Sequence, residues 1–203
     1  MTDRNAFINQ LSKWHSAKEG GIVHEMMVTT YNTIKPLPRN YEVTIKDPWC
    51  AIFISAAAQA VKLTDIIYPE CSSTKMYQEY VKRNLNAPAN ARPEIGWIAF
   101  YGTNDTNMNH VGVVANVGPT GFTTIEGNWN DRVSIRAHSY SAPIVRAFGT
   151  PLFLDIDVEL FLARNFMVNR GIFQGDENGN MMWDRPPTRD ELALVFYRYH
   201  NMR

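Results

Sequence analysis

Residues 47–61 read Asp-Pro-Trp-Cys-Ala-Ile-Phe-Ile-Ser-Ala-Ala-Ala-Gln-Ala-Val, and this stretch decides the fold. Its apolar character predicts a buried helix. Asp47 is suited to cap that helix, and Pro48 is suited to be its first residue. Cys50 then lies in the first turn, beside unpaired backbone N–H groups and the positive end of the helix dipole. Both features favour the thiolate, the nucleophilic form of cysteine, so Cys50 is a candidate catalytic residue.

Apolar spacing along the rest of the chain predicts helices first and strands afterwards. Phe7, Leu11 and Trp14 recur at helical spacing. After Pro93 the pattern changes to short apolar runs separated by turn residues. We therefore expect an α+β fold with N-terminal helices packed on an antiparallel sheet. The expected helices cover residues 4–18, the region of residues 26–34, residues 48–63 and residues 74–84, and the expected strands cover residues 96–101, 110–117, 122–126, 133–136 and 144–148.

The composition argues against several classes of protein. Twenty basic and twenty acidic residues give a formal net charge of zero, so we do not expect strong non-specific binding to nucleic acid. No apolar run approaches the ~18 residues of a membrane span, and the N-terminal residues lack the pattern of a signal peptide. Cys50 and Cys71 are the two cysteines. A lone disulfide between them is not the favoured interpretation, and Cys71 is interpreted as a small loop or core residue.

A predicted hairpin brings together the groups that a reactive cysteine needs. If the chain turns within Gly118–Gly121, residues 110–117 run antiparallel to residues 121–128. His110 and Glu126 then fall near each other at the open end of the hairpin. The sequence therefore predicts a histidine–carboxylate pair.

Strand alternation suggests how Cys50 reaches this pair. His110 shares a face with Gly112, and packing of the Cys50 helix against that face would bring sulfur and imidazole together. A histidine can take the thiol proton and later protonate a leaving amine. A third polar group can orient the ring, with Glu126 the first choice and Asn128 the second.

Each of these residues also has a simpler interpretation. A cysteine at a helix start is more often a small core residue, and a glutamate beside Gly-Asn is more often a turn carboxylate. The order of the three residues and their expected elements favour catalysis. Trp49 and Trp129 neighbour the proposed site and are candidate substrate-binding residues, although tryptophans are more often core residues.

No cofactor and no metal are expected. The histidines outside the proposed site show no metal-ligand spacing with cysteines or acids. The run from Asp176 to Pro187 differs from a calcium-binding loop, because its glycine is fourth rather than sixth and its twelfth residue is proline.

Three motifs resemble those of CHAP domains, the cysteine, histidine-dependent amidohydrolases/peptidases of phage endolysins and bacterial cell-wall hydrolases. They are Asp-Pro-Trp-Cys-Ala-Ile-Phe-Ile-Ser (47–55), Asn-His-Val-Gly-Val-Val (109–114) and Ile-Glu-Gly-Asn (125–128). The resemblance covers about residues 5–151. The family usually has Gly-Asp before its first strand, whereas this chain has Gly96-Trp97 at a position that is not catalytic.

The resemblance implies a papain-like CHAP fold over residues 1–151. It also implies roles for four residues: Cys50 as nucleophile, His110 as general base, Glu126 as the orienting acid, and Asn128 as an aid to the ring or the substrate.

Residues 155–203 are expected to form a small helical module, with helices over residues 156–170 and 188–199. Two segments, Gly171–Asn180 and Pro187–Arg198, are similar to S-layer-homology-like segments, which bind wall polymers. The module could therefore bind the cell wall, and the alternative is a helical cap on the catalytic domain.

The expected function is hydrolysis of an amide bond in bacterial peptidoglycan, as an N-acetylmuramoyl-L-alanine amidase or a peptide endopeptidase. A phage endolysin that stays in the host cytoplasm before release would fit the N-terminal sequence. The alternatives are a non-catalytic wall-binding or immunity-related protein on the same scaffold, and a thiol acyltransferase.

Overall fold

The computed structural model describes residues 2–140, 144–153, 166–168, 170–172 and 188–201. The chain divides into two compact units, residues 3–155 and residues 156–203, and each is described by itself. No helix in the described ranges is long and apolar enough to cross a membrane.

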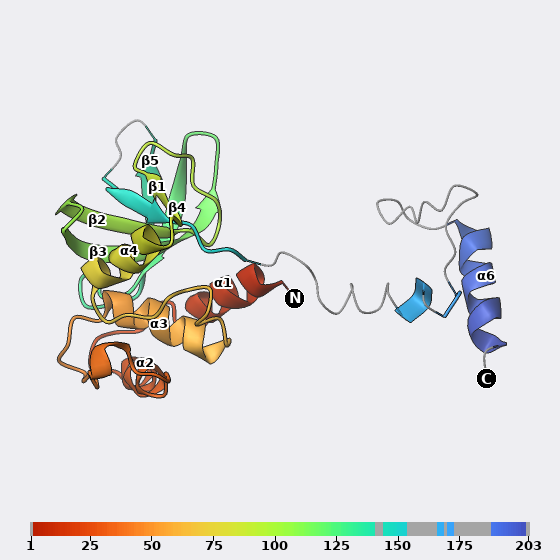
Figure 1. Ribbon diagram of the computed structural model, residues 1–203, viewed down its shortest axis with the longest axis horizontal. Coiled ribbons are helices and arrows are strands. Elements are labelled where there is room, and N and C mark those ends of the chain that lie inside the picture. Colours follow the sequence, from red (N-terminus) through yellow and green to blue (C-terminus); the bar gives the residue numbers. More distant parts are fainter. Residues whose placement is uncertain (1, 141–143, 154–165, 169, 173–187, 202–203) are drawn as a thin grey trace. The chain divides into compact units, whose positions relative to one another are not determined.

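The first unit has the predicted α+β architecture (Figure 1). Its strands form one antiparallel sheet in the order β1-β6-β2-β3-β4-β5. β1 was not predicted, and it pairs with β6 at the sheet edge. The helices are α1 (Asp3–Lys13), α2 (Ile22–Asn32), the 3₁₀ turn η1 (Pro38–Asn40), α3 (Cys50–Ala60) and α4 (Ser73–Lys82), and the strands are β1 (Asn86–Pro88), β2 (Ile98–Asn104), β3 (Asn107–Val117), β4 (Gly121–Glu126), β5 (Ser134–Ser139) and β6 (Ala147–Gly149).

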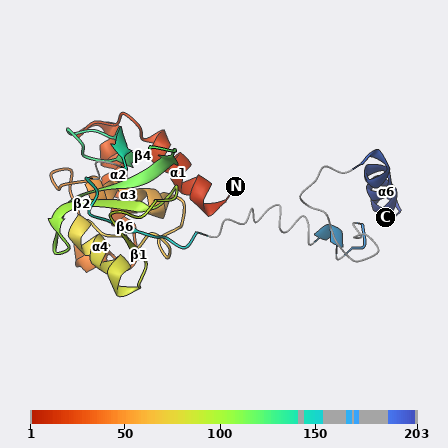
Figure 2. The same ribbon diagram turned by 90° about the horizontal axis from the view of Figure 1, so that it is seen from above.

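Helix α3 is the centre of this unit. Every residue from Cys50 to Ala58 is buried, since the helix has no polar face to present to water. α3 lies between α2 and the sheet in Figure 1, and the strands lie over it in the view from above (Figure 2). Burial of each large side chain, such as Ile52 or Phe53, contributes about 1.5–3 kcal/mol. Burial of the apolar run at residues 48–61 therefore fixes the position of the helix end that carries Cys50.

The helices cover the sheet face opposite to the expected one. Val111 and Val113 pack in one cluster with α3, whereas Val114 packs in a second cluster with Phe122 and Phe148. His110 shares a face with the second set by alternation. The expectation that α3 packs on the His110 face is therefore wrong, because α3 packs with Val111 and Val113, which point to the opposite face.

The start of α3 also differs from the prediction. The helix begins at Cys50, with Trp49 at the capping position and no side-chain cap. Asp47 accepts hydrogen bonds from the backbone N–H and the hydroxyl of Thr44 and from the hydroxyl of Tyr41 instead. The carboxylate closes the preceding turn, so it is not free to cap the helix. Cys50 is consequently the first helical residue.

In the second unit, helix α6 (Arg189–His200) closely matches its prediction. A reciprocal pair starts it: the Thr188 hydroxyl accepts from the Glu191 N–H, and the Glu191 carboxylate accepts from the Thr188 N–H. The expected helix over 156–170 and the segment Gly171–Asn180 lie largely outside the described residues.

Candidate active site

Cys50 stands at the N-terminus of α3 with its side chain almost fully buried. The first N–H groups of the helix have no acceptor within it, so hydrogen-bond donors are available at the helix end that carries the sulfur. Gly127 allows α3 to come this close to the end of β4, because a Cβ atom there would lie 2.5 Å from Cβ of Phe53. The geometry places the thiol beside the strand end that carries Glu126.

His110 and Glu126 form the predicted pair. The atoms His110 Nε2 and Glu126 Oε2 are 2.8 Å apart, and the carboxylate is completely buried. Pairing of Val113 with Ile125 sets the register that brings Gly112 opposite Glu126. A Cβ atom on Gly112 would lie 2.6 Å from Cγ of Glu126. Glycine at this position therefore makes room for the buried carboxylate.

The structure also brings Cys50 to His110. The two side chains lie close enough for the sulfur to raise the pKa of the imidazole. Nε2 of the ring faces Glu126, so Nδ1 is the nitrogen that remains for the sulfur. The pairing of β2 with β3 shifts register just after Tyr101 and His110, which leaves Asn109 without an opposite residue. His110 itself stays on the face of Tyr101 and Glu126, and Cys50 reaches it from the end of α3.

The carboxylate of Glu126 is held by a set of polar side chains that the sequence did not reveal. Oε1 accepts hydrogen bonds from the hydroxyls of Thr124 at 2.6 Å and Tyr101 at 2.7 Å. His138 Nε2 lies 2.8 Å from Thr124 Oγ1. Because Thr124 donates its own proton to Glu126, the ring N–H of His138 is the donor in that contact. Arg136 Nη1 donates to Oε2 at 3.2 Å.

These contacts decide the protonation of the pair. Burial raises the pKa of the Glu126 carboxyl, but hydrogen bonds, the one from His110 foremost, outweigh burial and hold the pKa well below its usual range. Burial lowers the pKa of His110, but hydrogen bonds to Cys50 and Glu126 and their negative charge raise it to about 9. The imidazole is therefore protonated at neutral pH.

Trp129 borders the pair on the exposed side. Its ring centre lies 5.6 Å from that of His110, and the Arg136 guanidinium lies 3.5 Å from the Trp129 ring centre. The Trp129 side chain is over a third exposed. The loop that carries it is anchored from another part of the chain, where Glu19 N–H bonds to the Asp131 carbonyl at 2.8 Å. Trp129 is thus presented to solvent next to the imidazole.

Two of the predicted site residues have other surroundings. Trp49 is completely buried, donates from Nε1 to Glu19 at 3.1 Å and packs 4.7 Å from the ring of His24. It is a core residue that anchors the start of α3, so the expectation of a substrate contact is corrected. Asn128 follows the strand end in a left-handed conformation, with φ of 59°. Its side chain makes no hydrogen bond within the part of the chain that the structure describes, so it does not orient the imidazole here.

Cys71 belongs to a different cluster. Both cysteines are free thiols. The sulfur of Cys71 lies 2.7 Å from Arg39 Nη2, and Arg39 also pairs with Glu70 at 3.3 Å. A hollow of about 440 Å³ opens between Cys71, Arg39 and the residues just before α3. Cys71 therefore has charged partners but no histidine.

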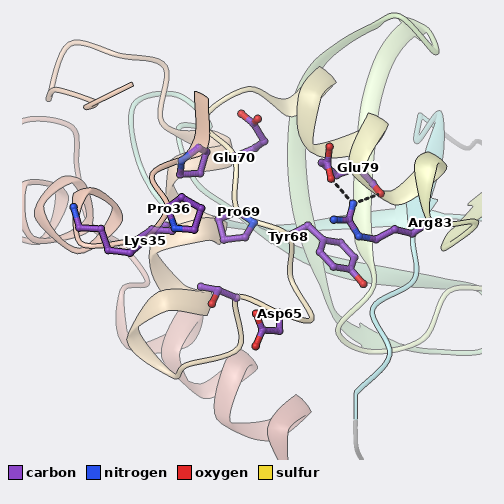
Figure 3. Close-up of a pocket in the computed structure, with 11 residues that line it drawn as sticks. Lys35, Pro36, Asp65, Tyr68, Pro69, Glu70, Glu79 and Arg83 are labelled. Carbon is purple, nitrogen blue, oxygen red and sulfur yellow. Dashed lines mark hydrogen bonds and ion pairs between the residues drawn. The ribbon is translucent and has the colours of Figure 1, made fainter. Parts of the chain in front are cut away.

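A second hollow, of about 620 Å³, is shown in Figure 3. Its lining includes Tyr68 and Pro69, with Arg83 stacked 4.0 Å over the Tyr68 ring and paired with Glu79. None of the proposed catalytic residues lines it. Among the described residues, no group of three or more His, Cys, Asp or Glu side chains is arranged to hold a metal ion.

Comparison with known proteins gives similarity to solved structures alone. No family model matches the sequence, and no curated protein does. The crystal structure of Ly7917 with the hydrolyzing product of MDP is similar at 12% identity and a TM-score of 0.43, over 73% of this chain and 62% of that chain. The crystal structure of Ly7917 is similar at 14% identity and a TM-score of 0.40, over 74% and 63%. This chain therefore spans less than two thirds of the length of these neighbours.

The sequence could have indicated one of the polar side chains around Glu126. Thr124 precedes it by two residues, on the same face of a predicted strand. Arg136 and His138 fall on that face only through the pairing of Glu126 with Ser134, and this register is not encoded locally.

Proposed function

We propose that this chain is a cysteine amidohydrolase of the CHAP type that cleaves an amide bond in bacterial peptidoglycan. One observation carries the chemistry: the Cys50 thiol lies beside the His110 ring, and that ring is hydrogen-bonded to the buried Glu126 carboxylate. The motif resemblance in residues 47–55, 109–114 and 125–128 supplies the substrate class.

The line of residues is suited to acyl transfer. The thiolate of Cys50 attacks the carbonyl carbon, a carbon–sulfur bond forms, and the carbonyl π electrons move to oxygen. Backbone N–H groups at the start of α3 stabilise this oxyanion. Collapse of the intermediate breaks the carbon–nitrogen bond, and His110 gives its proton to the leaving amine. A thioester remains on the sulfur.

Water completes the cycle. The neutral His110 ring takes a proton from water as the oxygen attacks the thioester carbon, and the carbon–sulfur bond breaks to release a carboxylic acid. Glu126 holds the ring in place and favours the protonated ring throughout, because its own pKa is far below neutral. Hydrolysis thus returns the sulfur and the imidazolium to their starting state.

The proposal also includes the role of the enzyme and of the C-terminal residues. The resemblance to endolysins favours a bacteriolytic enzyme, with amidase or endopeptidase specificity. We propose that residues 155–203 form a separate module that contacts wall polymers.

Digestion of purified peptidoglycan tests the function. The enzyme and its Cys71→Ser variant should release soluble fragments whose masses identify one cleaved amide bond, and Cys50→Ser should release none. The hydroxyl at position 50 would lack the accessible anion of a thiol. Fragments that carry an added amine in place of water would identify a transferase. Equal lysis by Cys50→Ser, or no cleavage by the unmodified enzyme, would refute the proposal.

A further inference from the structure

Arg136 lies beside the proposed triad, and most of its N–H donors have no acceptor among the described residues. It stands on β5, opposite Thr124, on the face that carries Glu126. A guanidinium has five N–H donors. One of these bonds to Glu126, and the others meet no acceptor among the residues that the structure describes. The side chain is 21% exposed, so the remaining donors have access to solvent.

The guanidinium is held in a fixed plane. Its face stacks 3.5 Å above the ring of Trp129, and its edge is tied to Glu126. A ligand that binds here therefore does not have to order a flexible side chain. A planar fork of parallel N–H groups fits a carboxylate with two hydrogen bonds. The arrangement is suited to a carboxylate ligand.

The position of the positive charge also favours an anion. Glu126 is the buried carboxylate of the site, and it faces two cationic side chains, Arg136 and His110. With a thiolate on Cys50 the charges of the site balance, so the preference for an anion comes from position. The partly exposed guanidinium stacks on Trp129 at the outer side of the site. A negatively charged ligand is therefore attracted to the exposed side of the site.

We propose that Arg136 forms an anion-binding subsite that takes a carboxylate of the substrate peptide near the scissile amide. The proposal rests on the proposed function and narrows its substrate class to acidic peptides. Two hydrogen bonds, of 2.8 and 3.2 Å, link the His110 ring through Glu126 to Arg136. The bound carboxylate therefore lies within a few extended residues of the His110 ring, at ~3.5 Å per residue.

A purely positioning role for Arg136 makes a different prediction. If Arg136 only holds Glu126, its loss slows reaction at Cys50 equally for charged and neutral reagents. If it binds a carboxylate, its loss removes a preference for the charged one. The ratio of two rates at the same sulfur separates the two roles.

The test uses iodoacetyl-Gly-Gly with a free carboxylate and the same compound with a C-terminal amide. In each case the thiolate displaces iodide and a thioether forms. The rate at Cys50 is followed by mass spectrometry of the peptide that contains it. Arg92 provides a matched control, because it also stacks on an aromatic ring, 4.8 Å above Tyr140, and donates one hydrogen bond, to the Pro119 carbonyl.

We expect the acid to alkylate Cys50 faster than the amide, and Arg136→Gln to lower the acid-to-amide ratio about two- to tenfold at low salt. Arg136→Lys should retain much of the ratio and Arg92→Gln all of it. An unchanged ratio in Arg136→Gln, or an equal fall in Arg92→Gln, would overturn the subsite. Failure of both reagents to label Cys50 would overturn the subsite and the proposed function together. A charge preference without Cys50-dependent hydrolysis would refute the proposed function alone.

Discussion

Replacement of Glu126 by glutamine should make the enzyme's activity fall at high pH far more than at low pH. The carboxylate is one of two groups that raise the pKa of His110 from 6.5 to about 9 against the effect of burial. A raised pKa means that the protonated ring is favoured in the folded state. Its contribution to stability is complete below pH 6.5 and is lost as the pH rises through about 9.

The size of the effect follows from these values. At pH 8 a ring with a pKa of about 9 is about 90% protonated. A ring with the ordinary pKa of 6.5 would be about 3% protonated at the same pH. Cys50 still raises the pKa in the variant, so we expect a loss of about tenfold in kcat/KM at pH 8, with ~30-fold as the upper bound. At pH 6 both rings are largely protonated, and the defect should nearly vanish.

The assay is the pH profile of kcat/KM on a soluble muropeptide for the enzyme and Glu126→Gln. Glu79→Gln is the control, because it removes a partly exposed carboxylate that is paired with an arginine outside the site. The descending limb near pH 9 should move toward neutral pH in Glu126→Gln only. A loss that is equal at pH 6 and pH 8 would refute the electrostatic reasoning and leave only a role in orienting the ring.

Three further predictions concern the same unit and the C-terminal residues. His110→Ala should abolish hydrolysis as fully as loss of the Cys50 thiol, and a double variant much worse than either single variant would show that the two do not act as one unit. Gly112→Ala should lower activity and lower the free energy of unfolding by about 1–3 kcal/mol, since the added methyl must displace the buried carboxylate. Gly118→Ala is the control, because its Cβ would lie 3.5 Å from the nearest atom, and it should leave the free energy of unfolding nearly unchanged. Removal of residues 156–203 should preserve turnover on soluble muropeptides and lower it on intact walls if the module binds the wall, whereas an equal loss on both substrates with a lower Tm would favour a packed cap.

The sequence predicted the elements that depend on short-range pattern. The apolar run at residues 48–61 has no polar face, so it could only be a buried helix, and α3 is one. The turn residues Gly118–Gly121 separate two apolar strands and predicted the hairpin of β3 and β4. The candidate residues Cys50, His110 and Glu126 were found because each stands at the end of such an element or at a break in its pattern.

Tertiary structure decided what depends on contacts between distant segments. The side of β3 that α3 covers was predicted wrongly, since alternation gives two faces and only the packing of Val111 and Val113 selects one. Asp47 was expected to cap α3, but the nearby Thr44 competes for the same carboxylate. Arg136 reaches Glu126 through a strand register that no local pattern encodes. Local periodicity arises from the geometry of a single helix or strand, so the sequence shows it. The groups around a buried carboxylate depend on how separate elements pack, and that packing exists only in the folded chain.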